Sequence, residues 1–180
     1  GQVSVKALGL HEHGGRMVFV GSGSAVVSGN TPVNDILQLE RYRSIDSTIL
    51  NCAQISPEEL QAIGELLMNY NEPAKTISVL AWMAGCFIKE HLRSRDVKFP
   101  HLMLIGEAGS GKSTTVEHVV LPVFSRTKII AAGQVTAFTL MKDSASSNLI
   151  PQALDEFKPS KIDRIRLDTL YNHFRNNYDG

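Results

Sequence analysis

The N-terminal region of the chain alternates between apolar and polar positions. This alternation runs over residues 1 to about 30 and has the two-residue period of strands that are buried on one face. A turn-rich stretch at 11–15 predicts a hairpin, and the apolar run at 25–27 predicts a third strand. Residues 31–55 carry mixed strand and helix signals. We therefore expect a β-rich region over residues 1–55.

Residues 56–98 have the three- to four-residue apolar period of helices. The sequence Ser56-Pro57-Glu58-Glu59 is a capping box, in which a hydroxyl and a carboxylate satisfy backbone donors where a helix begins. A second helix is predicted after a break at 71–73. Its longest apolar run, at 77–88, has about half of the ~20 residues that a membrane-spanning helix needs. We expect a pair of helices, the second of them a core helix, and no membrane segment.

From Phe99 onward the pattern alternates between short apolar strands and amphipathic helices. A β-α-β-α-β-α order is typical of an α/β domain built on a parallel sheet. In chain order, we expect strands and helices at 102–105, 113–120, 128–132, 135–141, 148–154 and 162–178. The first strand is apolar throughout, so we expect it to be buried on both faces. The sequence therefore predicts that residues 99–180 form an α/β domain with helices around a parallel sheet.

A glycine-rich loop joins the first of these strands to the first helix. Residues 106–113 read GEAGSGKS, which satisfies the P-loop (Walker A) pattern G-x-x-x-x-G-K-[ST]. Glycines allow positive φ angles, so that successive N–H groups form a nest for an anion. The residues expected to bind the nucleotide are Gly106, Glu107, Ala108, Gly109, Ser110, Gly111, Lys112, Ser113 and Thr114. A glycine-rich turn without a ligand is the weaker alternative, because strand, loop, lysine, hydroxyl and helix coincide.

Two side chains of this loop are predicted to carry its chemistry. Lys112 is expected to reach the β- and γ-phosphates of a nucleoside triphosphate and to act in catalysis as a point charge. The Ser113 hydroxyl is expected to take one coordination position on Mg²⁺. The P-loop thus predicts ATP and Mg²⁺ as ligands.

An acidic pair ends the last predicted strand. Asp155 and Glu156 follow an apolar run 43 residues after Lys112, and in a parallel sheet this Walker B position lies beside the P-loop. Asp155 is expected to hold Mg²⁺ through water, and Glu156 is the candidate base for the water that attacks the γ-phosphate. Pro151 and Gln152 interrupt the apolar run, so a solvated strand end is an alternative. The pair favours ATP hydrolysis over phosphate transfer to a substrate hydroxyl.

The composition changes this picture little. The chain has 18 Lys and Arg residues against 18 Asp and Glu residues, so no overall charge indicates a polyanionic partner. Its two cysteines, Cys52 and Cys86, lack the spacing of a metal site, and we interpret both as buried thiols. This cysteine usage is typical of a reducing compartment and predicts a cytoplasmic protein.

Several segments of the chain resemble one protein family. They are residues 71–73, 99–102, 106–114, 136–142, 147–151, 154–159 and 178–180. They look like the helicase-like P-loop ATPases encoded beside primases in phages and mobile elements, which are similar to AAA+ helicases of the minichromosome-maintenance type. The resemblance implies an AAA+-like fold, a homo-oligomeric ring with ATP at the subunit boundaries, and DNA as the partner. Residue by residue, it reaches only Lys112, Ser113, Asp155 and Glu156.

We therefore expect the ATP-hydrolysing core of a DNA-acting motor, of the replicative helicase type. No series of stacking aromatics is visible, although Lys158, Lys161, Arg164 and Arg166 form a local basic cluster. Arg164, Arg166 and Arg175 are more simply the solvated side of a helix than arginine fingers. We expect the chain to be a piece of a longer protein that supplies such a finger. A P-loop phosphotransferase and a regulatory nucleotide-binding module are the alternatives.

Overall fold

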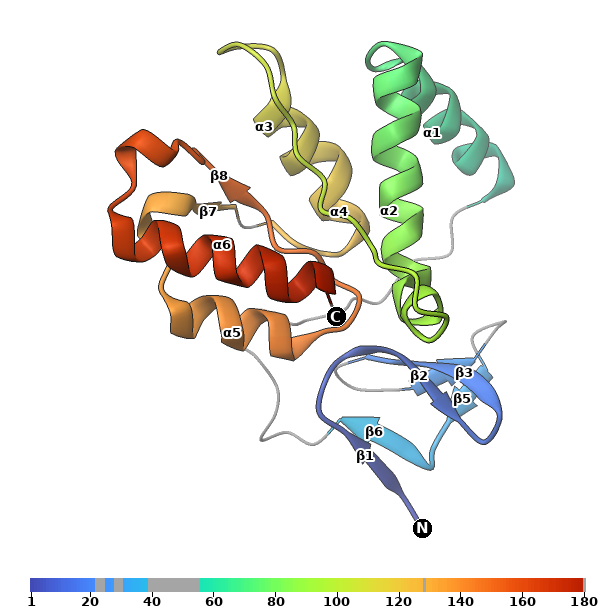
Figure 1. Cartoon of the computed structure of the whole chain (residues 1–180). Helices are drawn as coiled ribbons and strands as arrows, with labels where there is room; N and C mark the ends of the chain where they lie inside the picture. The colour runs from blue at the N-terminus through green and yellow to red at the C-terminus, as the bar shows by residue number, and fades with distance from the viewer. Residues whose placement is uncertain (22–24, 28–30, 39–55, 128, 180) are drawn as a thin grey trace.

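The computed structural model describes residues 1–21, 25–27, 31–38, 56–127 and 129–179. Cys52 and the first residue of the strand expected at 128–132 lie outside these ranges. The described part has a mixed α/β architecture with small parallel and antiparallel sheets. Figure 1 shows the N-terminal strands at the bottom, a helical pair at the upper right and the remaining helices toward the left.

The N-terminal region forms two small sheets. Its strands are β1 (Val3–Val5), β2 (Gly9–His13), β3 (Arg16–Val20), β4 (Ala25–Val27), β5 (Thr31–Val33) and β6 (Ile36–Gln38). Strands β2 to β5 form an antiparallel sheet, whereas β1 pairs in parallel with β6. The predicted hairpin is confirmed as β2–β3, and both residues of its turn, Gly14 and Gly15, have positive φ. The strand predicted at 25–27 is confirmed as β4.

Two helices follow; the start of the first was predicted correctly, whereas the second begins at Pro73, inside the predicted break at 71–73. They are α1 (Pro57–Asn69) and α2 (Pro73–Arg93). The capping box is present, because Ser56 Oγ accepts from Glu59 N at 3.1 Å and Glu59 Oε2 accepts from Ser56 N at 2.9 Å. Helix α1 buries none of its residues, whereas α2 buries Thr76, Val79, Met83 and Cys86. Burial raises the pKa of the Cys86 thiol to about 12, which confirms the buried thiol predicted there.

The strand expected at 102–105 is not part of any sheet. The segment is extended, and Leu102 and Leu104 pack against the cluster formed by α2, Val120, Phe124 and Leu149. The alternate side chains face outward, because Met103 is 65% exposed and Ile105 is 86% exposed. The expectation of a strand buried on both faces is therefore wrong: α2 covers one face, and no neighbouring strand pairs with the segment in the described part of the chain.

Helix α2 instead fixes the beginning of this segment by a very close contact. A Cβ atom on Gly85 would lie 2.5 Å from Cε2 of Phe99, so only glycine lets the ring approach the helix. The Phe99 ring also stacks on Trp82 at 6.0 Å between centroids, and the Trp82 indole donates to the carbonyl of Pro100 at 2.8 Å. The chain therefore leaves α2 in a fixed direction toward the glycine-rich loop.

A continuous helical run follows the loop, as predicted, and it is longer than expected. It consists of α3 (Lys112–Thr115), a π-helical stretch (Val116–Val120) and α4 (Leu121–Val123). Pro122 sits just after the π-helical stretch and has no N–H to donate to a carbonyl of the preceding turn. Val120, Leu121 and Phe124 anchor the end of the run in the core.

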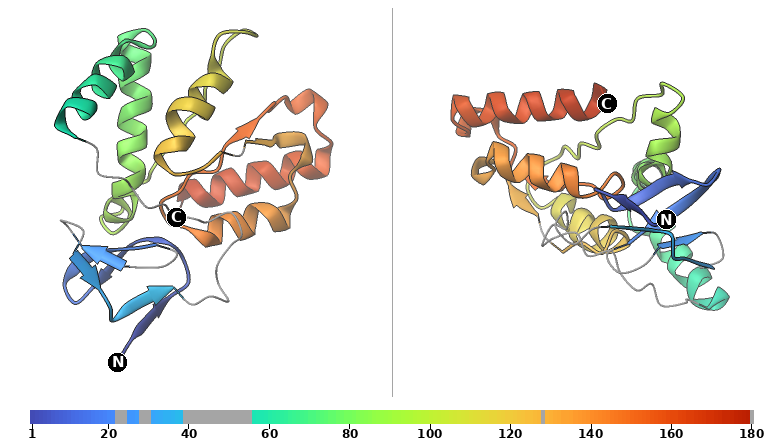
Figure 2. Two further views of the ribbon diagram at one scale, coloured as in Figure 1. Left: turned by 180° about the vertical axis from the view of Figure 1, so that it is seen from behind. Right: turned by 90° about the horizontal axis from the view of Figure 1, so that it is seen from below.

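The last part of the chain contains a two-stranded parallel sheet and two helices. These elements are β7 (Ile130–Ala131), α5 (Ala137–Ser146), β8 (Leu154–Asp155) and α6 (Arg164–Asp179). Ile130 lies opposite Leu154, and Ala131 lies opposite Asp155. Helices α5 and α6 lie side by side (Figures 1 and 2). They share an apolar cluster with β7 and β8 that includes Ala132, Val135, Leu140 and Leu170.

The strand expected at 148–154 is much shorter than predicted and is confined to β8. In the residues before β8, backbone N–H groups bond to a side chain and not to a neighbouring strand. The N–H groups of Leu149 and Ile150 both donate to Ser147 Oγ at 3.1 Å. Pro151 has no N–H to offer to a strand ladder. The helices expected at 135–141 and 162–178 are confirmed as α5 and α6 with shifted ends.

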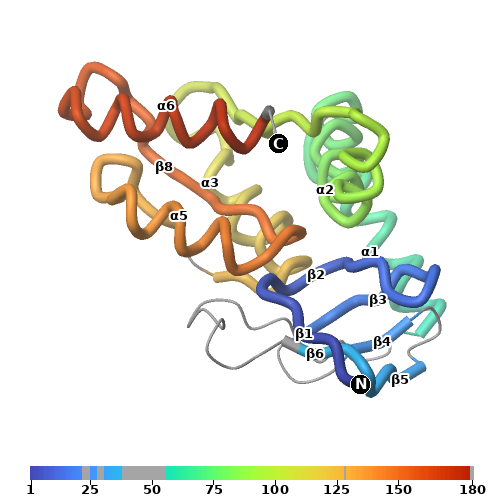
Figure 3. The backbone as a smooth tube through the Cα atoms, turned by 60° about the horizontal axis from the view of Figure 1, so that its bottom comes forward, coloured from blue at the N-terminus to red at the C-terminus, as the bar shows by residue number. Residues whose placement is uncertain are grey.

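The N-terminal sheet is joined to the last part of the chain through Asn148. The Asn148 amide accepts from Leu10 N at 3.1 Å and donates to Leu10 O at 2.7 Å, as a strand backbone would. Main-chain bonds from Leu8 N to Ser146 O and from Asn148 N to Leu8 O continue this pairing. A Cβ atom on Gly9 would clash with the side-chain oxygen Oδ1 of Asn148, so only glycine allows this close approach. Figure 3 shows the blue start of the chain beside the orange end of α5.

Among the described residues, none of the helices combines the length and the apolar character needed to cross a membrane. The longest, α2, carries charged residues such as Lys75, Lys89 and Glu90 along its length. Its apolar side chains are used instead to build the core with the helical run and Leu149.

The two glycines in the helical pair predict opposite effects of the same substitution. Gly64→Ala in α1 meets nothing within 4 Å, so the free energy of unfolding should rise by about 0.5–1 kcal/mol, the usual helix gain. Gly85→Ala in α2 has to displace the Phe99 ring, and we expect a net loss of about 1 kcal/mol. Urea unfolding followed by circular dichroism measures both. Equal stabilisation by the two variants would show that Phe99 does not depend on the missing Cβ.

Candidate functional site

The glycine-rich loop stands at an exposed tip of the molecule, between the extended segment and α3 (Figure 1). Gly109 and Gly111 have φ angles of +78° and +81°, a conformation that side chains strongly disfavour. A Cβ on Gly106 would lie 2.8 Å from Ser110 Oγ. The backbone of the loop therefore explains Gly109 and Gly111, as the sequence predicted, whereas a Cβ on Gly106 would meet only the side chain of Ser110. Gly111 is the N-cap residue of the helical run.

The Lys112 side chain folds back over this loop. Its ammonium donates to Gly106 O at 2.9 Å, to Glu107 O at 2.6 Å and to Ser110 Oγ at 3.1 Å. All three acceptors are neutral, so a phosphate can compete for the ammonium with a full negative charge. The lysine is thus held in the loop by groups that a bound anion can replace.

Ser113 and Asp155, which are 42 residues apart in the sequence, meet at the base of the loop. Ser113 Oγ donates to Asp155 Oδ2 at 3.0 Å. Strand β8 ends at Asp155, and its parallel pairing with β7 presents this carboxylate at the carboxyl end of the strands. Asp155 Oδ1 accepts from the N–H of Glu156 at 2.7 Å, which fixes the orientation of the carboxylate. The structure therefore brings together the two residues predicted to hold Mg²⁺.

Glu156 follows directly with an unusual backbone. Its φ angle is +55°, which is uncommon for a residue other than glycine. Its side chain is exposed, and the interactions of the described residues include no hydrogen bond or ion pair to its carboxylate. Such outliers often mark functional positions, because surrounding structure must hold the backbone there. The Glu156 carboxylate is thus unpartnered among the described residues, whereas the Asp155 carboxylate accepts from Ser113 Oγ and from the N–H of Glu156.

The donor set at this site suits Mg²⁺ in company with phosphate oxygens. Within the described ranges, no group of three or more His, Cys, Asp or Glu side chains gathers into a metal cage. Mg²⁺ is usually bound through one or two carboxylates together with substrate phosphates and waters. One hydroxyl and one carboxylate, from Ser113 and Asp155, fit that pattern.

The predicted basic residues near α6 lie at the surface. Lys158, Lys161, Arg164 and Arg166 are all exposed, as is Arg175. Arg166 donates to Gly133 O and pairs with Asp163 at 3.5 Å, so it is tied to its own part of the molecule. Ile165, the residue between Arg164 and Arg166, is 81% exposed, so this face of α6 lies in solvent.

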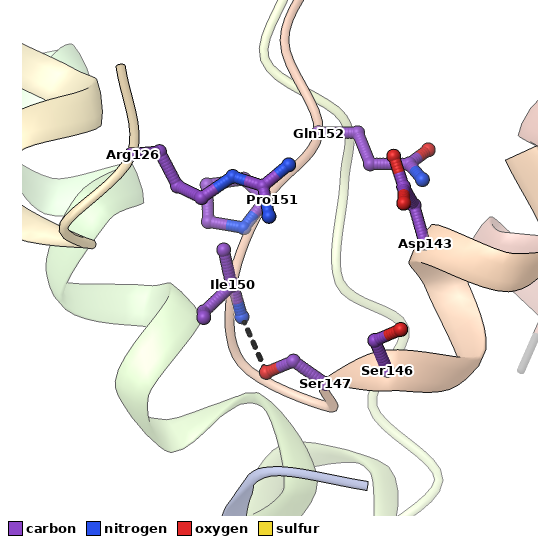
Figure 4. A pocket seen from close by; sticks show the side chains of 7 residues that line it. All are labelled: Arg126, Asp143, Ser146, Ser147, Ile150, Pro151 and Gln152. Carbon is purple, nitrogen blue, oxygen red and sulfur yellow. Dashed lines mark hydrogen bonds between the residues drawn. The ribbon is translucent and has the colours of Figure 1, made fainter. Parts of the chain in front are cut away.

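A polar pocket behind β8 was not foreseen from the sequence. It has room for about one water molecule and is lined by Arg126, Asp143, Ser146, Ser147, Ile150, Pro151 and Gln152 (Figure 4). Asp143 Oδ2 is buried there without a hydrogen-bond partner. The signal that could have drawn attention to it is the pair Pro151-Gln152, which interrupts an otherwise apolar run.

A scan against protein-family models, a search of curated proteins and a search of solved structures each found no match for this chain. The function therefore has to be argued from the loop and the residues around it. The strongest features for that argument are the conformation of the loop, the position of Lys112 and the contact between Ser113 and Asp155.

Proposed function

We propose that this chain is the ATP-binding and ATP-hydrolysing core of a DNA-acting motor, and that residues 99–180 have a P-loop ATPase fold of the AAA+ type. The observation that supports it best is the 3.0 Å hydrogen bond from Ser113 to Asp155. A glycine-rich turn without a ligand has no reason to place a loop hydroxyl on a carboxylate 42 residues away. A P-loop does, because both oxygens are needed at one metal ion.

Different residues of the P-loop would contact different parts of ATP. The positive φ angles at Gly109 and Gly111 are the conformation in which backbone N–H groups would form a nest for phosphate, and the start of the helical run would add its own donors. Lys112 exchanges its neutral loop acceptors for phosphate oxygens. Ser113 and Asp155 would hold Mg²⁺, which when bound neutralises charge on the phosphates.

Glu156 supplies the base in this proposal. Its carboxylate is unpartnered among the described residues and follows Asp155 directly, so it can take a proton from a water molecule while Asp155 stays with Ser113. Hydrolysis needs such a base, whereas transfer to a substrate hydroxyl also needs a site for the acceptor. The two adjacent carboxylates therefore have separate tasks.

DNA and a ring of identical subunits are part of the proposal through the family resemblance. The exposed residues Lys158, Lys161 and Arg164 of the basic cluster support a polyanionic partner, since exposed cations contact phosphate groups without reading sequence, whereas Arg166 is paired with Asp163. A cytoplasmic location is proposed as well, because the buried thiol of Cys86 suits a reducing compartment.

One observation favours a second candidate, a regulatory module that binds ATP without efficient turnover. In the described part of the chain no side chain orients the Glu156 carboxylate, and a general base needs a defined position to act efficiently. Binding would then be intact while hydrolysis stayed slow. The variants of the acidic pair described below separate this candidate from the motor.

Lys112→Ala is expected to weaken ATP binding at least about tenfold, because a charge-assisted contact to phosphate is lost. The fold should be unaffected, since Lys112 is not part of the core. Titration with a fluorescent ATP analogue measures the affinity, and thermal unfolding checks the fold. Lys142→Ala, at an exposed position of α5, is the matched control and should bind like the parent chain. Unchanged affinity in folded Lys112→Ala rules out the phosphate role.

The acidic pair should respond differently to two isosteric changes. Glu156→Gln removes the base but keeps the shape, so ATP binding should persist while hydrolysis falls by about 10² or more. Asp155→Asn should instead lower the gain in ATP affinity that Mg²⁺ provides. Phosphate release and analogue titration, with and without single-stranded DNA and with EDTA in place of Mg²⁺, measure both effects. If Glu156→Gln hydrolyses ATP at the rate of the parent chain, Glu156 is not the base and the motor proposal is wrong. If ATP is consumed without release of free phosphate and a phosphorylated acceptor forms, the protein is a phosphotransferase.

A further inference from the structure

Gln152 ties the segment before β8 to both of the helices beside it. Its side-chain Nε2 donates to Leu140 O in α5 at 3.3 Å, and its Oε1 lies 3.2 Å from His173 Nε2 in α6. The amide therefore bridges two helices that pack through Leu140 and Leu170. Figure 4 shows the Gln152 side chain on the α5 side of the pocket, near Asp143.

The partners of His173 determine which of its ring nitrogens carries the proton. Because Gln152 Nε2 is the donor to Leu140, Gln152 Oε1 is an acceptor, and His173 Nε2 must be the donor to it. The Asn177 amide donates from Nδ2 to His173 O at 3.0 Å and lies 3.1 Å from Nε2 and 3.2 Å from Nδ1 of the ring, so it does not distinguish the two ring nitrogens. The bond between Nε2 and Gln152 is therefore the contact that ties the amide to α6.

Positive charge on His173 is disfavoured for two reasons. Burial lowers the pKa of His173, and the neighbouring His101 lowers it further. His101 lies on the segment that leads into the P-loop and bonds to Phe174 O at 2.9 Å. The neutral ring, with its Nε2–H on Gln152, is therefore the favoured form.

Gln152 is three residues from the carboxylate of the candidate site. The next residue, Ala153, accepts from Ile130 N at 3.0 Å, and β8 follows at once with Asp155 at its end. A strand of two residues has few hydrogen bonds of its own to hold it in register. The position of Asp155 beside Ser113 therefore depends on how the preceding segment is anchored.

We propose that Gln152 and His173 are positioning residues for Asp155: the hydrogen bond between their side chains anchors the segment before β8 and so supports Mg²⁺-dependent nucleotide binding. The proposal rests on the proposed function for its ligand. Neither residue touches the nucleotide site; both act through the segment that carries Asp155. Nucleotide binding by the P-loop alone, without Mg²⁺, does not use Asp155 and is expected to stay largely unchanged.

The first test measures the gain in affinity for a fluorescent ATP analogue when Mg²⁺ replaces EDTA. At pH 7.5, Gln152→Ala should reduce this gain by about tenfold, as the loss of a residue that orients a metal ligand does, and should leave the affinity in EDTA unchanged. Equal losses with and without Mg²⁺ would indicate general damage to the fold and overturn the positioning role. A Mg²⁺-dependent gain in affinity for Gln152→Ala equal to that of the parent chain would also overturn the positioning role.

The second test removes the partner of Gln152 in α6. His173→Phe lacks the N–H donor and should lower the Mg²⁺ gain at pH 7.5, whereas His173→Gln keeps a donor and should retain most of it. His91→Phe, at an exposed position in the last turn of α2, is the control and should bind like the parent chain. A parental Mg²⁺ gain in His173→Phe overturns the role of His173.

Hydrogen exchange provides a readout without nucleotide. The Ile130 amide, which donates to Ala153, should exchange about fivefold faster in Gln152→Ala after correction for intrinsic rates, the equivalent of one lost hydrogen bond. His173→Phe should have the same effect, and His173→Gln should not. A parent chain that binds no ATP analogue would overturn the proposed function, and exchange would still decide the positioning role: unchanged exchange in Gln152→Ala refutes it.

Discussion

The segment from Ser146 to Asp155 is the constraint on which the rest of the structure depends. It is mostly irregular, so its polar groups have to find partners outside a strand ladder. Each partner lies in a different part of the molecule: Asn148 bonds to the N-terminal sheet, Gln152 to α5 and α6, and Asp155 to the P-loop. Leu149 adds an apolar contact with the core around α2. One short segment therefore aligns all parts of the fold with the candidate site.

The candidate site is supported from two directions. On one side, the contact of Gly85 with Phe99 directs the extended segment toward the P-loop. On the other side, β7 and the helices α5 and α6 hold β8 and its terminal carboxylate. The bond between Ser113 and Asp155 connects these two supports. An exposed loop with few contacts of its own is thus placed by its neighbours, while its glycines set only its internal shape.

Local signals in the sequence predicted the local features well. The capping box at Ser56 and the glycines of the P-loop depend on interactions within a few residues, and both have the expected geometry. The position of Asp155 beside the P-loop was also predicted, because the order of elements restricts where a strand can end, and its bond to Ser113 is consistent with that position. The apolar run at 102–105 was misinterpreted as a central strand, since periodicity reports which residues are apolar and does not report which neighbours pair with them. The anchoring role of Gln152 depends on side chains from two distant helices, and no local pattern encodes it.

The joint between Leu10 and Asn148 spans 138 residues of sequence, and this separation has a kinetic consequence. During synthesis at about 5–20 residues per second, the N-terminal sheet emerges on the order of ten seconds before its partner segment. Throughout that interval Leu8, which is fully buried in the finished fold, has no cover from Ser146 and Asn148. Contacts of such long range also slow the folding of the whole chain, because the loop must close before the contact stabilises it. We therefore expect the N-terminal sheet to dock, and Asp155 to reach its position beside Ser113, in the same late step of folding.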